Sequence, residues 1–357
     1  MKFAEMSAGA SKQSLGRAPD PLFTLRPQER AAIHSVFFWS DALLATGSES
    51  GAVGLWDLSS RRQAAGWRLC EGQSACIHVD RVEALSGAPL LTQTRDGVVR
   101  VWDVQEGSAT MGGGGPESGD GKKKAPLLEV QTGAYGFCRC DVSGDGVLAA
   151  ATDARDRSVC MWDLRSGGRG VCGTVKEPAT EGRGASMVMH CAFAGADDGY
   201  LACCYEDGTM SLWDRRQGRW PVSGSRVHEG EGGMVIRFAI DGGMRRGVAA
   251  GTHELVVFDV DCGSDPGGLR VAERLSHPVR GLSDVRIRSD HKLFATAGWD
   301  HRVRLFTLHT ARPTPLAVLD FHTAAVHALA FSPHRLDLLA TASADCRVAI
   351  WSLYPPK

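Results

Sequence analysis

Short apolar runs separated by tight-turn residues recur along the whole chain. The apolar positions Val98, Val101 and Trp102 fit a pleated strand, and the Gly or Asp before such runs fits a two-residue turn. A further apolar strand lies upstream in each unit, as in residues 235–240 and 325–331. The pattern therefore predicts β-strands along the chain.

Seven of these units end in a similar segment built on an aromatic residue. The aromatic anchors are 45 to 60 residues apart, and they are Trp56, Trp102, Trp162, Trp213, Phe258, Phe306 and Trp351. This period is that of WD40 repeats, in which four short strands form one blade of a propeller. A lone four-stranded sheet covers neither of its faces, so such blades pack radially on one another. We therefore predict an all-β fold, a seven-bladed WD40 β-propeller.

The last unit predicts how the ring closes. It ends at residues 351–353 with only YPPK after it, so it lacks its own outer strand. We expect the N-terminal segment LFTL, Leu22 to Leu25, to supply that strand. Residues 21–357 should then form one propeller after a disordered tail at 1–20, with a flexible glycine-rich and lysine-rich insertion at about 106–125.

The seventh unit also carries the spacing of the WD40 hydrogen-bond tetrad. Its members are His322, Thr341, Asp345 and Trp351. A catalytic role for the histidine and the aspartate is the alternative interpretation. A structural role is favoured, because buried polar groups must be paired and this network pairs them inside a blade.

The charge and composition of the chain limit the classes of partner and the cellular compartments that we expect. Forty Lys and Arg offset 41 Asp and Glu, for a net charge of -1 over 357 residues, and no basic stripe predicts direct nucleic-acid binding. The N-terminal run MKFAEMSAGASKQS is not a signal peptide, and no apolar stretch approaches the 18 residues of a membrane span. The 11 cysteines are odd in number and scattered, so we expect reduced thiols. These features favour a protein of the nucleus and cytoplasm.

The last third of the chain is similar to one WD40 family. Residues 293–306, residues 315–331 and the ending IWSLYPPK resemble the G-protein β-subunit-like family. Its fungal members are called ASTRA-associated proteins, and its plant members include the decreased-size-exclusion-limit protein. The resemblance implies a chromatin regulator or an adaptor in Triple-T cochaperone and ASTRA assemblies, which mature phosphatidylinositol-3-kinase-related kinases. A G-protein γ subunit is not expected as a partner, since residues 1–20 show no apolar heptads.

Two enzymatic or metal-binding interpretations can be weighed against this scaffold. The run GGGGPESGDGKKK at 112–124 resembles a phosphate-binding loop, but Pro116 stands where that loop needs Gly. Zinc could be held by Cys138, Cys140, Cys203 and Cys204. Neither pair has the two-residue gap of structural zinc sites, and strand alternation separates adjacent cysteines. We therefore predict no enzyme activity, no metal and no cofactor.

Two W-D-x-R segments offer an alternative function. They are formed by Trp162, Asp163 and Arg165 and by Trp213, Asp214 and Arg216. Propeller substrate receptors use such boxes to dock on the adaptor of cullin-RING ubiquitin ligases, and an arginine beyond a strand can present a planar fork of donors to a partner. A ubiquitin-ligase receptor is therefore the alternative to the scaffold.

A propeller offers two faces and a rim to its partners, and one group of candidate contact residues shares a single face. The turn between the second and third strands of each blade lies on the narrow face, and Glu49, Arg95, Arg155, Glu206 and Trp299 occupy equivalent positions there. Trp299 is either packed on its neighbours or exposed as an anchor, with His301 and Arg302 beside it. Exposed Trp and Arg residues dominate the energetics of protein interfaces.

Overall fold

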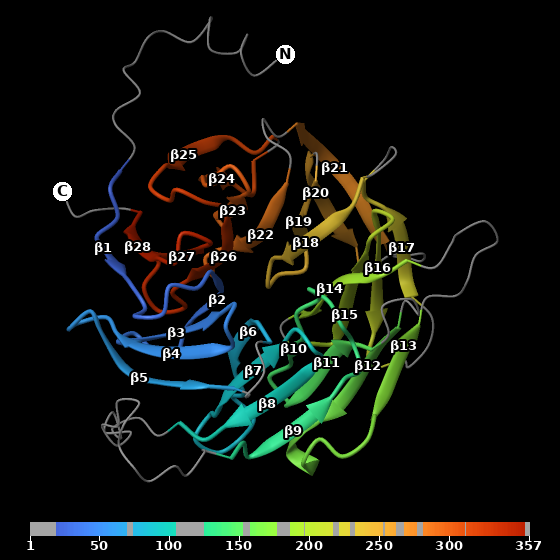
Figure 1. Ribbon diagram of the computed structural model, residues 1–357. Helices are drawn as coiled ribbons and strands as arrows, with labels where there is room; N and C mark the ends of the chain where they lie inside the picture. The colour runs from blue at the N-terminus through green and yellow to red at the C-terminus, as the bar shows by residue number, and fades with distance from the viewer. Residues whose placement is uncertain are drawn as a thin grey trace, which may run out of the picture.

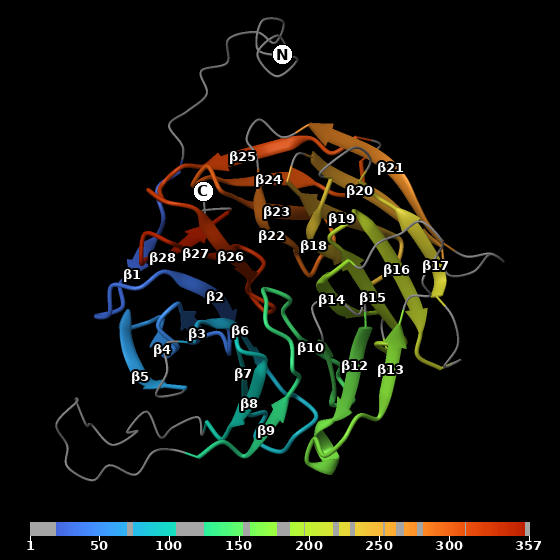
Figure 2. The same cartoon turned by 45° about the vertical axis from the view of Figure 1, so that its right-hand side comes forward.

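The computed structural model describes most of the chain. The described ranges are 19–69, 74–104, 125–152, 158–176, 186–195, 197–216, 221–228, 233–252, 254–261, 268–276, 281–310 and 312–353. They form seven four-stranded antiparallel sheets arranged radially around a centre (Figures 1 and 2). The predicted seven-bladed β-propeller is confirmed. The insertion and most of the N-terminal tail lie outside the described residues.

The first three blades follow the chain from the N-terminal side. Blade 1 contains β2 (Ile33–Phe38), β3 (Leu43–Ser48), β4 (Ala52–Asp57) and β5 (Arg62–Arg68). Blade 2 contains β6 (Cys76–Arg81), β7 (Leu90–Thr94), β8 (Val98–Trp102) and β9 (Leu128–Gln131). Blade 3 contains β10 (Asp141–Val142), β11 (Val147–Ala151), β12 (Ser158–Asp163) and β13 (Gly173–Lys176), with the short 3-10 helix η1 (Leu164–Ser166) after β12.

The remaining blades complete the ring. Blade 4 contains β14 (Val188–Ala194), β15 (Tyr200–Tyr205), β16 (Thr209–Asp214) and β17 (Pro221–Arg226). Blade 5 contains β18 (Val235–Ile240), β19 (Arg246–Gly251), β20 (Glu254–Asp261) and β21 (Gly268–Ser276). Blade 6 contains β22 (Leu282–Ile287), β23 (Leu293–Gly298), β24 (Val303–Thr307) and β25 (Pro315–Leu319). Blade 7 contains β26 (Val326–Phe331), β27 (Leu338–Ser343), β28 (Val348–Ser352) and the N-terminal strand β1 (Phe23–Leu25).

The N-terminal strand closes the ring, as predicted from the missing outer strand of the last unit. β1 pairs antiparallel with β28, so that Phe23 lies opposite Ile350 and Leu25 opposite Val348. The backbone N–H of Leu22 also donates to the Ile350 carbonyl at 2.7 Å. Leu25 is 1% exposed and belongs to a core cluster shared by blades 7 and 1. The two ends of the chain thus stabilise one blade together.

Small residues in the second strands let neighbouring blades approach closely. The β3 sequence LLATGS is almost wholly buried, and the hydrophobic clusters of the protein combine side chains of adjacent blades. A Cβ atom built on Gly47 would lie 2.5 Å from the Sγ of Cys76 in the next blade. A larger residue at that position would therefore push blades 1 and 2 apart.

The centre of the ring is crossed by a buried arginine. The inner segment of blade 3 is irregular before β10, and Arg139 extends from it across the ring. Its Nη1 pairs with the Oδ2 of Asp284 at 3.1 Å, and its Nη2 donates to the carbonyls of His34 at 2.9 Å and His327 at 3.1 Å. The backbone N–H of Leu329 also donates to Asp284 at 3.0 Å. Arg139 therefore connects blade 3 to blades 1, 6 and 7.

The two ends of the ring are named by their turns. The narrow face carries the turns between second and third strands, which include Glu49, Arg95, Glu206 and Trp299. The wide face carries the turns between first and second strands and between third and fourth strands, which include Arg165 and Arg216. Within the described ranges, no helix has the length and apolarity to cross a bilayer.

Candidate protein-binding site

The tetrad residues of blade 7 are joined by hydrogen bonds in the interior of the blade. His322 contacts Asp345 through Nδ1 at 2.9 Å and Thr341 through Nε2 at 2.8 Å, and Trp351 Nε1 donates to Thr341 Oγ1 at 3.0 Å. Burial alone would raise the pKa of Asp345, but the hydrogen bond and charge of His322 lower it overall. All the polar atoms of this chain of contacts are used inside the blade, which is the arrangement of a structural network.

Parts of this network recur in other blades. Trp56 Nε1 donates to Thr46 at 3.0 Å in blade 1, and Trp102 Nε1 donates to Thr92 at 2.8 Å in blade 2. In blade 6 the anchor is a phenylalanine, so no indole N–H reaches Thr296, and its buried hydroxyl has no hydrogen-bond partner among the described residues. Asp300 in that blade instead pairs with Arg304.

Trp299 is both packed and exposed. One part of its ring lies on the backbone of Gly281, where a Cβ atom would overlap the indole and where φ is +102°. The residue nevertheless remains 50% exposed on the narrow face. Packing on the Gly281 backbone thus holds the indole ring in one position, while its exposed half can still contact a partner. A side chain held in this way is a pre-positioned interface anchor.

His301 and Arg302, predicted beside Trp299, are occupied within the protein. Both reach Asp320, which follows β25: His301 Nδ1 lies 3.4 Å from Oδ1, and Arg302 Nε donates to Oδ2 at 3.0 Å. These two side chains therefore support the surface around Trp299.

The other predicted narrow-face residues separate into different regions. Glu206 is exposed on blade 4, and Arg155 lies outside the described residues. Arg95 is exposed and lines a groove of about 730 Å³ between blades 1 and 2 and the start of blade 3. Glu49 lines the same groove. Among the members of the predicted set that the structure describes, Arg95 and Glu49 are the two brought to one depression.

Two exposed aromatic residues of this face were missed from the sequence. Tyr135 is 74% exposed and Phe137 is 56% exposed, and both lie in the irregular segment before β10. The Arg95 guanidinium lies 4.3 Å from the centroid of the Phe137 ring. The sequence signal was their position, since both aromatics lie just before residues 141–142, in the stretch where the inner strand of the third unit should begin.

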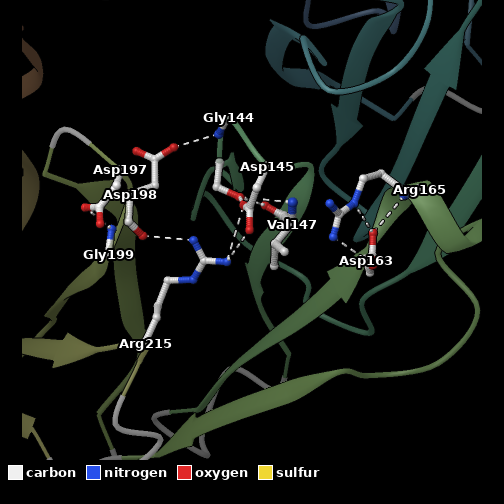
Figure 3. A network of polar contacts seen from close by, with 10 residues as sticks. Gly144, Asp145, Val147, Asp163, Arg165, Asp197, Asp198, Gly199 and Arg215 are labelled. Atoms are coloured by element: carbon white, nitrogen blue, oxygen red, sulfur yellow. Dashed lines mark hydrogen bonds and ion pairs between the residues drawn. The ribbon is translucent and has the colours of Figure 1, made fainter.

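The W-D-x-R boxes lie on the wide face, and the arginine of each box turns back toward its own aspartate, as Figure 3 shows for Arg165 and Asp163. Arg165 pairs with Asp163 of its own box through two contacts of 3.1 and 3.2 Å. Arg216 pairs in the same way with Asp214 at 3.1 and 3.0 Å and also donates to the Tyr200 hydroxyl at 3.1 Å. Trp162 and Trp213 are buried. Each guanidinium fork is therefore already satisfied by a carboxylate two residues before it.

The residue between Asp214 and Arg216 connects two blades instead. Arg215 donates to the Asp198 carbonyl at 2.8 Å and pairs with Asp145 of blade 3 at 3.2 Å (Figure 3). Its guanidinium also lies 4.8 Å from the Phe193 ring centroid. This part of the wide face is thus an inter-blade contact.

The cysteines considered as zinc ligands do not converge. Cys203 and Cys204 are both buried, but they point to opposite faces of β15 and belong to different core clusters. Cys140 is buried in a third cluster, and burial raises its pKa well above the ordinary value. These thiols act as small core residues.

Buried and partly buried titratable groups line a cavity beside the inner strands of the blades. Asp80, Asp141, His78, His190 and Arg286 surround a cavity of about 240 Å³. Burial, together with the charge of Asp80, raises the pKa of Asp141 to about 7. Burial lowers the pKa of both histidines, so both are neutral at physiological pH.

Asp141 makes stability depend on pH. Its folded-state pKa is about 7 and its ordinary value is 3.8, so the folded protein holds a proton that the unfolded chain has already lost between these values. The free energy of unfolding therefore falls as the pH rises from 3.8 to about 7. Asp141→Asn keeps an acceptor for the Phe193 N–H and removes the charge, so we expect it to stabilise the protein by about 2–3 kcal/mol more at pH 8 than at pH 5.

Thermal denaturation of parent and variant at the two pH values measures this difference. Asp290→Asn is the matched control, because the Arg288 hydrogen bond lowers the pKa of Asp290 and its removal should cost stability at pH 8. An Asp141→Asn variant whose advantage is the same at pH 5 and pH 8 would rule out the shifted carboxyl.

Comparison with known proteins agrees with the architecture. The family model "WD domain, G-beta repeat" matches residues 178–214, 271–307 and 313–352. The chain is 33% identical to guanine nucleotide-binding protein subunit beta-like protein 1 of Mus musculus, over 94% of this chain and 97% of that protein. It is 24% identical to ASTRA-associated protein 1 of Schizosaccharomyces pombe over 94% of this chain and 99% of that protein. With the Penicillium rubens protein of the same name it shares 25% identity over 87% of this chain and 80% of that protein. A propeller of seven blades closed by its N-terminal strand, matched over most of its length by these relatives, belongs to the WD40-repeat family of G-protein β-subunit-like and ASTRA-associated proteins.

Proposed function

We propose that this protein is an adaptor that binds its partners through the narrow face. The observation that carries the proposal is Trp299, half exposed and held in place by Gly281 on a rigid ring of blades. The exposed aromatics Tyr135 and Phe137 and the groove beside Arg95 lie on the same face. Exposed aromatic and arginine side chains on a pre-formed surface are typical of interface hot spots. The hydrogen-bonding atoms of His322 and Asp345 are already paired inside blade 7, which supports a non-catalytic role.

The assembly that we propose is of the ASTRA or Triple-T cochaperone type, which matures large kinases, or a related chromatin assembly. The support is the name shared by the fungal relatives, ASTRA-associated protein 1. Work in such assemblies would place the protein in the nucleus and the cytoplasm. The proposal does not include a G-protein γ subunit, nucleic acid or a membrane as a partner.

The competing proposal is a substrate receptor that docks on a cullin-ligase adaptor through the W-D-x-R boxes. The pairing of Arg165 with Asp163 and of Arg216 with Asp214 weighs against it. A partner that recruited either arginine would first have to displace a bidentate carboxylate. The adaptor at the narrow face is therefore the better supported function.

Substitutions on the two faces separate these functions. We expect Trp299→Ala to weaken the binding of cochaperone partners by about 2 kcal/mol or more, because truncating a central aromatic anchor has costs of this size. Arg165→Ala combined with Arg216→Ala should leave the same complex intact. The measurement is co-purification with quantitative mass spectrometry, followed by titration of the purified partner.

Folding is the necessary control for both variants. Both exposed arginines should be replaceable with little change in melting temperature, whereas Trp299→Ala loses the packing on Gly281 and should melt somewhat lower but remain folded. Loss of a cullin adaptor from the double arginine variant, together with unchanged partners of Trp299→Ala, would favour the ligase receptor instead.

A further inference from the structure

The groove on the narrow face has a defined chemical character. It lies between blades 1 and 2 and the start of blade 3, with a volume of about 730 Å³. Its lining consists of short polar side chains, two arginines, two acidic residues and one exposed tyrosine, namely Arg30, Ala31, Glu49, Ser50, Ser74, Ala75, Arg95, Asp96, Tyr135 and Gly136. Such an open depression, lined by residues of three blades, suits an extended segment of polypeptide better than a compact small molecule.

The two arginines of the groove have no acidic partner within the described part of the chain. Arg30 and Arg95 are both exposed, and no ion pair joins either of them to another described residue. Arginines nearby behave differently: Arg68 pairs with Glu29, and Arg302 on the same face pairs with Asp320. The groove therefore keeps two guanidinium groups available for an acceptor from outside.

Arg95 is also held in position. Its guanidinium lies 4.3 Å from the centroid of the Phe137 ring, so the aromatic face supports the cation while its N–H donors remain open. A pre-positioned guanidinium loses less conformational freedom on binding, and its planar fork matches a carboxylate. Tyr135, 74% exposed, supplies an amphipathic surface next to it.

The acidic residues of the groove favour a ligand that carries a carboxylate over one that carries a phosphate. Glu49 and Asp96 line the same depression, and Asp96 already accepts a hydrogen bond of 2.5 Å from Thr94. A phosphorylated side chain carries up to two negative charges and would be repelled by both carboxylates. A single carboxylate suffers less from this repulsion and can still pair with the arginine fork.

We propose that this groove binds an extended acidic segment of a protein partner, in which an Asp or Glu side chain pairs with Arg95 and Arg30 and a neighbouring apolar or aromatic side chain packs on Tyr135. The inference rests on the proposed adaptor function and specifies the chemistry of the partner at one part of the narrow face. Glu49 adds a preference for a segment that carries one acidic residue rather than a run of them.

Selection of peptides from a random twelve-residue phage library on the full-length protein tests the proposal directly. We expect enrichment of Asp or Glu next to an aromatic or aliphatic residue. The best peptide is then synthesised with a fluorescent label, and its dissociation constant is measured by fluorescence polarisation. Replacing its acidic residue by Gln or Asn should weaken binding at least tenfold.

Variants of the protein locate the contact. Arg95→Ala should weaken the peptide at least tenfold, Arg30→Ala several-fold, and Arg95→Lys should recover only part of the loss because lysine lacks the planar fork. Arg302→Ala is the matched control on the same face and should leave the affinity unchanged, since its guanidinium already serves Asp320. Circular dichroism and melting temperature should be the same in all four variants.

Three results would overturn the proposal. They are a selection without acidic enrichment, equal affinities of the parent and Arg95→Ala, and a gain of more than tenfold when phosphoserine replaces the acidic residue. The last would identify a phosphopeptide site. These failures are distinct from failure of the adaptor function, because co-purification that depends on Trp299 would be unaffected by them.

Discussion

Deletion of residues 1–27 is expected to lower the melting temperature by about 10 °C or more, or to cause aggregation. The truncation removes β1, and with it the pairing to β28 and the buried Leu25. Burying one leucine contributes about 1.5–3 kcal/mol, and each lost ladder hydrogen bond adds to this. One kcal/mol corresponds to about 2–4 °C in proteins somewhat smaller than this one. The bare edge of β28 would also be free to pair with another chain.

Deletion of residues 1–18 is the matched control. This shorter truncation leaves every residue of β1 in place, and we expect it to melt like the parent. Scanning calorimetry and light scattering on the three proteins measure the two effects. Equal melting temperatures for all three would show that β1 does not hold the ring closed.

The blades and their closure could be predicted because both depend on local patterns. Each anchor such as Trp351 comes at a regular distance after a small-residue strand, and the absence of a fourth strand after it pointed to Leu22–Leu25. A strand pattern with a period of two residues is visible in any short window. Ring closure followed because the last unit lacked a strand that the first segment could provide.

The chemistry of the surface was less predictable, because it depends on side chains from different blades. His301 and Arg302 were candidate contacts for a partner, but Arg302 binds Asp320, 18 residues beyond it, and His301 Nδ1 lies 3.4 Å from the same carboxylate. The alternative function requires the box arginines to be open to a partner, but each pairs with an aspartate that its own backbone turn brings close. Sequence spacing identifies which residues share a face, but it does not show which charges are already neutralised.

The contact of Arg139 with Asp284 is the clearest case of a feature that local reasoning misses. The two residues are 145 positions apart and belong to blades on different sides of the ring. The segment CRCD around Arg139 resembles an ordinary inner strand, yet most of it is irregular, and β10 is only two residues long. The long side chain crosses the centre because its hydrogen-bond acceptors lie on blades 1, 6 and 7.

Asp284→Ala is accordingly expected to destabilise the protein by about 3–5 kcal/mol, the range for a buried ion pair that loses one partner. The side chains of Arg139 and Asp284 are 7% and 1% exposed. Burial lowers the pKa of Arg139 to about 10, so the guanidinium stays charged at neutral pH and would be left without its carboxylate. Urea denaturation followed by tryptophan fluorescence measures the loss.

A double-mutant cycle with Arg139→Ala distinguishes this pair from simple loss of packing. The double variant should be more stable than the sum of the two single losses predicts, because neither member of this pair is then left buried without the other. Asp337→Ala provides the surface control: its partner Arg335 is 55% exposed, and the loss should be below about 1 kcal/mol. A loss from Asp284→Ala no larger than this control, or additive single and double losses, would mean that the buried pair does not connect the blades energetically. A large and non-additive loss would instead show that the ring is stabilised at two places. One is the N-terminal strand that completes blade 7, and the other is the buried ion pair that connects distant blades at the centre.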